Sequence, residues 1–103
     1  MKTKKIKLWH ATDFENCLSI TEHGIRRGCD HVVYACKRPE EAARFVAIRG
    51  VKNILCVAFE VDETDIHESF DHNKTFFKCD AYYVDKDIQP KDIVGLRLFS
   101  VGQ

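Results

Sequence analysis

Alternating apolar and polar residues predict β-strands near both ends of the chain. In residues 5–10, Ile6, Leu8 and His10 fall on one side of such a strand, and the same alternation runs through residues 94–99. Residues 54–59 are instead an unbroken apolar run that continues through Val61, as expected for a central strand buried on both faces. Two segments rich in β-branched and aromatic residues predict further strands, at 31–36 and 75–84.

Two helices are predicted in the first half of the chain. Residues 12–15, Thr-Asp-Phe-Glu, have the form of a capping box, so we expect a helix to begin there and to end at Gly24. Its inner stripe is expected to comprise Phe14, Cys17, Leu18 and Thr21. Pro39 opens the second helix, which has two glutamates in its first turn and runs to Gly50.

The connections between these elements are polar. Residues 26–30 are interpreted as a loop, and residues 62–73 as a connection with one short strand around Ile66. Residues 85–87 break the strand before them, and residues 89–92 make a turn. Two early helices followed by a strand-rich second half indicate an α+β fold with a mainly antiparallel sheet. At 103 residues and 11.9 kDa, the chain fits a single domain, residues 1–103.

Charge and hydropathy narrow the classes of function. Sixteen basic side chains against sixteen acidic ones give no net charge, which argues against binding polyanions by bulk electrostatics. Lys2, Lys4, Lys5 and Lys7 form a candidate nucleic-acid contact, although solvated lysines at a terminus are the more ordinary interpretation. No secretory h-region and no membrane-length apolar stretch is present, so we expect a cytoplasmic protein without a membrane partner.

The cysteines predict neither disulfides nor a metal site. There are five of them, an odd number, and most lie in apolar runs, which indicates reduced core thiols. The nearest pair, Cys29 and Cys36, has six residues between them, whereas zinc ligands are normally closely paired.

The positions that could carry chemistry lie in or at the ends of predicted strands. They are His10 and Thr12 after the first strand, Tyr34 in the second and Asp80 in the fourth. Each alone is more often a structural residue than a catalytic one. Asp80 stands out because it interrupts an apolar strand, and a buried carboxylate is costly unless it is paired or used. A strand edge that faces water would also explain it.

The order of these segments follows a known pattern. A His-Ala-Thr strand end at 10–12 precedes a helix that runs into a Gly-Ile pair at 24–25, and Val-Val-Tyr-Ala follows at 32–35. A helix with Ala-Ala-Arg-Phe at 42–45 and a strand at 78–84 complete the order. The sequence resembles the ADP-ribosyltransferase superfamily with a His-Tyr-Glu constellation, which includes diphtheria-toxin-like and poly(ADP-ribose)-polymerase-like enzymes. The likeness covers about residues 8–98.

The resemblance implies roles for individual residues, with NAD as the substrate. His10 would bind the adenosine-side ribose, the Ala11 backbone would hold the nicotinamide carboxamide and Thr12 would support that turn. Tyr34 and Phe45 would enclose the nicotinamide ring, since aromatic faces suit a flat cation. The expected reaction is NAD-dependent transfer of ADP-ribose to a macromolecular acceptor, for which nucleic acid is a candidate, with release of nicotinamide. His10 and Asp80 would be the catalytic residues.

The chemistry of this reaction is compatible with one carboxylate. Cleavage of the bond to ribose releases neutral nicotinamide from a cationic ring, so the general acid of ordinary glycoside hydrolysis is not required. Asp80 would bind a ribose hydroxyl and stabilise the positive charge that develops on the sugar.

Three departures from the family pattern leave alternatives open. Asp80 stands where Glu is usual, Ala11 where Gly is usual and Phe45 where Tyr is usual. One alternative is a non-catalytic module of the same fold that binds a nucleotide or a phosphorylated end. The other is transfer of an RNA 2'-phosphate to NAD, the reaction of the RNA 2'-phosphotransferases. These enzymes and the DNA-modifying toxin transferases belong to the same superfamily and have similar strand and helix openings. The 2'-phosphate transfer requires basic side chains to hold an extra phosphate, and the candidates are Arg26, Arg27, Lys37 and Arg38.

Overall fold

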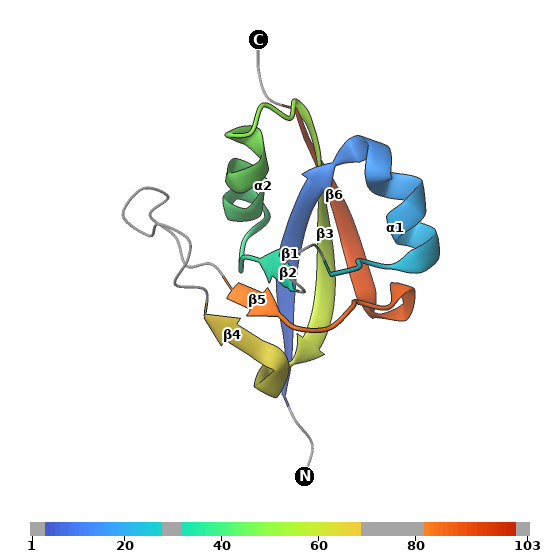
Figure 1. Ribbon diagram of the computed structural model, residues 1–103, viewed down its shortest axis with the longest axis vertical. Coiled ribbons are helices and arrows are strands. Elements are labelled where there is room, and N and C mark those ends of the chain that lie inside the picture. Colours follow the sequence, from blue (N-terminus) through green and yellow to red (C-terminus); the bar gives the residue numbers. More distant parts are fainter. Residues whose placement is uncertain (1–3, 28–31, 69–81, 101–103) are drawn as a thin grey trace.

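The computed structural model describes residues 4–27, 32–68 and 82–100 and shows two antiparallel sheets and two α-helices (Figure 1). This confirms the predicted α+β class and the mainly antiparallel pairing. The 3-10 turns are η1 (Phe14–Asn16), η2 (Glu63–Asp65) and η3 (Pro90–Asp92). The regular elements are β1 (Lys5–Asp13), α1 (Cys17–His23), β2 (Val33–Ala35), α2 (Pro39–Ala47), β3 (Asn53–Asp62), β4 (Ile66–Glu68), β5 (Tyr82–Val84) and β6 (Ile93–Ser100).

Strand β3 is the centre of the first sheet, which has the order β1-β3-β6. Its residues from Ile54 to Phe59 are all buried, as the unbroken apolar run predicts. Leu55, Val57 and Phe59 point into one core cluster, whereas Ile54 and Cys56 belong to a second cluster on the opposite face. Successive side chains of a strand point to opposite faces of the sheet, so this one apolar run contributes to both core clusters.

Helix α2 covers the second of these faces (Figure 1). Pro39 is at its first turn, followed by Glu40 and Glu41, as predicted. Ala42 and Ala43 are buried, so the helix backbone lies close to the sheet. Ile48 lies past the last helical residue and is exposed.

The second sheet, of order β2-β5-β4, is joined to the first through one bridge. The Trp9 N–H donates to the Cys36 carbonyl at 2.7 Å, and the Cys36 N–H donates to the Trp9 carbonyl at 2.9 Å. This bridge places the segment that contains Tyr34 beside β1, which contains His10. Two residues 24 positions apart in the sequence thereby become neighbours.

The predicted capping box at Thr12 is wrong. Strand β1 continues to Asp13 because Thr12 and Asp13 still pair with Leu55 and Ile54 of β3. The cap is Asp13, whose carboxylate accepts the Glu15 N–H at 3.1 Å, and a 3-10 turn comes before α1. Pairing across the sheet outweighs the local capping signal.

The predicted inner stripe of α1 is wrong except at Cys17. Leu18 is 76% exposed and Phe14 is 43% exposed, and Thr21 faces solvent as well. Ile20 is the buried residue of this helix, and Cys17 is half-buried against the same core. The stripe is displaced because α1 begins at Cys17, after a 3-10 turn, and not directly after Thr12.

The other boundaries agree with the sequence in part. The short strand at Ile66 and the turn at residues 89–92 are present. β2 and β5 begin at Val33 and Tyr82, and residues 31 and 75–81 of the predicted strands lie outside the described residues. The same holds for residues 28–30 of the predicted loop.

Cysteine burial follows the expectation of reduced thiols. Cys36 and Cys56 are buried, Cys17 is half-buried, and all three are free. Cys29 and Cys79 lie outside the described residues. Neither helix in the described ranges is long and apolar enough to cross a membrane.

Candidate functional site

His10 lies at the junction of the two sheets. Its Nδ1 is 2.8 Å from the Tyr34 carbonyl oxygen, and since a carbonyl only accepts, Nδ1 carries the proton and donates. Burial lowers the pKa of His10 below its ordinary value, partly opposed by this hydrogen bond. The imidazole is therefore neutral near pH 7, and its Nε2 keeps a free lone pair as an acceptor.

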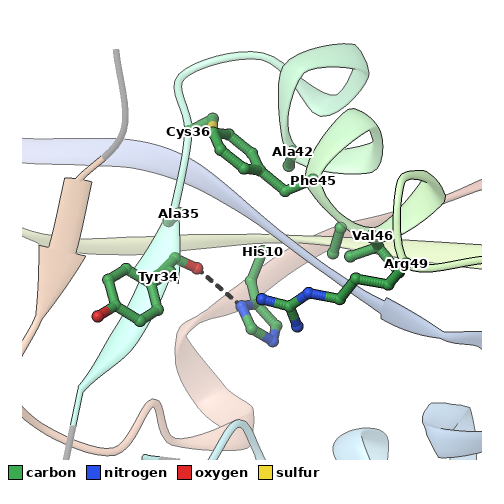
Figure 2. A pocket seen from close by; sticks show the side chains of 9 residues that line it. His10, Tyr34, Ala35, Cys36, Ala42, Phe45, Val46 and Arg49 are labelled. Carbon is green, nitrogen blue, oxygen red and sulfur yellow. Dashed lines mark hydrogen bonds between the residues drawn. The ribbon is translucent and has the colours of Figure 1, made fainter. Parts of the chain in front are cut away.

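A small cavity of about 100 Å³ opens beside His10 (Figure 2). Its walls come from β1, from β2 and the residue after it, and from α2 and the turn after it. The lining residues are His10, Ala11, Tyr34, Ala35, Cys36, Ala42, Phe45, Val46 and Arg49. Most of these side chains are apolar, and none is acidic. Four of the residues that the sequence assigns to cofactor binding, His10, Ala11, Tyr34 and Phe45, are thus brought together.

The dimensions of this cavity suit a single ring. An engineered apolar cavity of about 150 Å³ is known to admit benzene, which gives the scale. Phe45 on α2 and Tyr34 on β2 lie on two different walls, and Figure 2 shows the Tyr34 carbonyl turned towards His10 with its ring extending away from Phe45. At about 100 Å³ the cavity is somewhat smaller than that reference, so a single flat ring is the largest group it could enclose, and a whole nucleotide does not fit.

A second and larger cavity, of about 270 Å³, also borders His10. It lies towards α1, and its lining is more polar. The lining residues are His10, Thr12, Asn16, Ser19, Ile20, His23, Gly24, Ile25 and Arg26. The Thr12 hydroxyl accepts a hydrogen bond from the Asn16 amide at 2.8 Å. Thr12 therefore belongs to this second cavity, and His10 is the wall that the two cavities share.

Arg49 is a site residue that the sequence analysis missed. It lies just beyond α2, four residues after Phe45, and lines the first cavity. Figure 2 shows its guanidinium extended towards the His10 ring. Within the described part of the chain, Arg49 has no ion-pair partner. The signal that could have found it is the four-residue spacing from Phe45, which places both side chains on one face of a helix.

The other candidate residues do not converge on this site. Asp80 lies outside the described residues, so the structure does not place it relative to His10. Arg26 lines the second cavity, but Arg27 pairs with Asp87 at 3.2 Å. Lys37 lies over the Tyr82 ring. Among the described residues, these basic side chains therefore do not form the cluster that binding a 2'-phosphate would require.

The lysines near the N-terminus are also engaged locally. Lys5 forms an ion pair with Asp62 at 3.1 Å, and Lys7 lies over the Trp9 ring at 5.7 Å from its centroid. Lys4 is exposed, and Lys2 lies outside the described residues. Two of the four lysines thus have intramolecular partners on or beside β1.

Comparisons with known proteins add no relative. No protein-family model matches the chain, and no curated protein has a significantly similar sequence.

Proposed function

We propose that this protein has an ADP-ribosyltransferase-like fold, binds NAD around His10 and transfers ADP-ribose to a macromolecular acceptor, with release of nicotinamide. One observation carries the proposal: His10, Ala11, Tyr34 and Phe45 come from three separate elements and line one ring-sized cavity. The family resemblance assigns each of these residues to NAD.

In the proposed complex, the nicotinamide ring occupies the smaller cavity. Aromatic and aliphatic walls exclude water from such a ring, and the electron-rich face of Phe45 favours its positive charge. The adenosine half extends past His10 into the larger, more polar cavity. There the neutral His10 offers Nε2 as an acceptor for a ribose hydroxyl, because Nδ1 is already bound to the Tyr34 carbonyl.

Arg49 fits the anionic part of the same ligand. A guanidinium repels a cationic ring, so in the proposed complex it contacts the diphosphate that links the two halves of NAD. Guanidinium groups bind phosphate oxygens through paired, charge-assisted hydrogen bonds.

Asp80 would perform the chemical step. The bond between ribose C1' and the nicotinamide nitrogen breaks, and its electron pair leaves with the ring, which becomes neutral. The carboxylate stabilises the positive charge that develops on the ribose. A nucleophilic oxygen or nitrogen of the acceptor then bonds to C1' and gives up its proton.

A second candidate function is binding without turnover. No described residue that lines the smaller cavity is acidic, and the guanidinium of Arg49 is equally suited to a phosphorylated end. In that case the protein is a nucleotide- or phosphate-end-binding module of the same fold.

Calorimetric titration with NAD, combined with mass-spectrometric detection of nicotinamide, tests the proposal. The reaction is run alone and with RNA, DNA or cell lysate, so that dependence on the addition identifies the acceptor class. Phe45→Ala is expected to weaken NAD binding, and Asp80→Asn to abolish nicotinamide release while NAD still binds. Ile48→Ala, a truncation at an exposed site near the end of α2, is the matched control and is expected to behave as the unmodified protein.

The outcomes separate the two candidates. Release that Asp80→Asn removes supports the transferase. NAD binding that Phe45→Ala weakens, without release under any condition, supports the binding module and refutes the transferase. If NAD does not bind at all, the transferase is wrong, and so is a binding module whose ligand is NAD.

A further inference from the structure

Exposed apolar side chains are concentrated on one side of the molecule. In the described ranges there are six large ones, and five belong to β6 or to the segment formed by η1 and α1. They are Phe14, Leu18, Val94, Leu96 and Leu98. The segment and the strand are neighbours, because α1 contacts η3, the turn that leads directly into β6, and both lie at the same side of the molecule in Figure 1. Apolar surface gathered in this way marks an interaction site more often than apolar residues that are scattered singly.

Strand β6 is also an open edge of the first sheet. It pairs with β3 on one side, and among residues 4–27, 32–68 and 82–100 no strand pairs with its other side. The opposite edge, β1, is joined to the second sheet through Trp9 and Cys36. An eight-residue edge strand with exposed leucines is a template for pairing with another strand.

The sequence of β6 is compatible with pairing to itself. In an antiparallel pair with a two-fold axis at Leu96, Leu96 is opposite its own copy and Val94 is opposite Leu98 of the other chain. Arg97 is then opposite Gly95, so the glycine leaves room for the guanidinium and the two positive charges do not meet. Arg97 keeps its own partner, Glu40, which is 3.7 Å away on α2.

The neighbouring registers are worse. Moving the axis to Arg97 places two arginines directly opposite each other, and like charges at such positions are destabilising. Moving it to Gly95 places Asp92 opposite Leu98. Of the registers centred on Gly95, Leu96 and Arg97, the side chains favour the one centred on Leu96.

A second copy fits this surface for two further reasons. An interface with two-fold symmetry uses the same patch twice, so the residue on the axis must be compatible with itself, and Leu96 is. The chain has sixteen basic and sixteen acidic residues, so two copies are not kept apart by net charge.

From the edge strand, its apolar side chains and its self-complementary register, we propose that the protein forms a symmetric dimer through antiparallel pairing of β6 with β6 of a second copy, with the axis at Leu96. The first sheets of the two chains then form one continuous six-stranded sheet. Phe14 and Leu18 flank the junction. The proposal does not depend on the ligand that binds around His10.

Sedimentation equilibrium of the full chain over a range of concentrations tests the dimer. Leu96→Glu brings two carboxylates together on the axis and is expected to weaken self-association by roughly tenfold or more. Ile48→Glu introduces the same charge at an exposed apolar site just after α2, outside β6, and is expected to leave self-association unchanged. Because Leu96 is already 47% exposed, the variant is expected to fold, which circular dichroism verifies.

Cross-linking tests the register independently. Opposed residues in an antiparallel pair have Cα atoms about 4.5–5.5 Å apart, within the reach of a disulfide. Under mild oxidation, Leu96→Cys is expected to give a covalent dimer linked through residue 96, which peptide mapping identifies. Leu98→Cys is expected not to link to itself, because its opposed residue is Val94.

Two results would overturn the proposal. One is a protein that stays monomeric at every concentration, which would assign the patch to a different partner. The other is a dimer that Leu96→Glu does not weaken or in which residue 96 fails to cross-link, which would place the interface or the axis elsewhere.

Discussion

Substitution of Gly24 tests the packing between the end of α1 and the connection from β5 to η3. Gly24 ends α1 with a φ of +80°, a conformation that other residues rarely adopt. A Cβ at this position would overlap the carbonyl oxygen of Ile88, which is backbone and cannot rotate away. Gly24→Ala therefore forces the chain at Ile88 to move.

The size of the effect follows from what that movement breaks. The Ile25 N–H donates to the Ile88 carbonyl at 2.9 Å, and the Ile88 N–H donates to the Ile25 carbonyl at 2.7 Å. Each of these hydrogen bonds contributes about 0.5–1.5 kcal/mol net. The positive φ costs an alanine about 1–3 kcal/mol. We expect Gly24→Ala to reduce the free energy of unfolding by about 2–6 kcal/mol, a large part of the roughly 5–15 kcal/mol typical of a domain.

Gly50 provides the matched control. Its φ is +94°, but no atom lies within 4 Å of an added Cβ. Gly50→Ala is therefore expected to cost only the backbone term of about 1–3 kcal/mol. Urea unfolding followed by circular dichroism measures both variants. Equal losses of stability in the two variants would refute the argument, because they would show that the approach of Ile88 to Gly24 adds nothing.

Three further predictions concern charged and reactive groups. Burial holds the pKa of His10 below its unfolded value of about 6.5. Just below this pH the imidazole therefore binds a proton in the unfolded chain but not in the native state. The free energy of unfolding should consequently fall as the pH drops below about 6.5. His10→Asn can still donate a hydrogen bond to the Tyr34 carbonyl but does not titrate. Urea unfolding at several pH values should therefore show a weaker dependence of stability on pH for this variant. An unchanged dependence would mean that other groups cause it. If Arg49 contacts a phosphate, Arg49→Ala should weaken NAD binding by roughly ten- to a hundredfold, because a charged hydrogen bond contributes about 1.5–3 kcal/mol. The exposed Arg38→Ala should leave the affinity unchanged. Equal affinities of Arg49→Ala and the unmodified protein would exclude the contact. Burial raises the pKa of the Cys56 thiol to about 11, so iodoacetamide should alkylate the half-buried Cys17 before Cys56 in the native protein, and peptide mapping that finds the reverse order would contradict the packing.

Much of the fold could be predicted from local patterns. The unbroken apolar run of β3, the alternation in β1 and β6, and the proline that opens α2 are each a property of a few consecutive residues. Periodicity and helix capping act over one or two turns, so they can be read without knowledge of distant partners. His10, Tyr34 and Phe45 could be selected in the same way, from motif order.

The tertiary structure alone decided which faces are buried and which side chains meet. Thr12 belongs to β1 and not to a helix cap because it pairs with Leu55, 43 positions away. The bridge between Trp9 and Cys36 fixes the tautomer of His10 by bringing the Tyr34 carbonyl to it, and α2 packing brings Arg49 to the same cavity. These outcomes depend on pairing between segments distant in sequence, and no local pattern encodes the energy of such contacts.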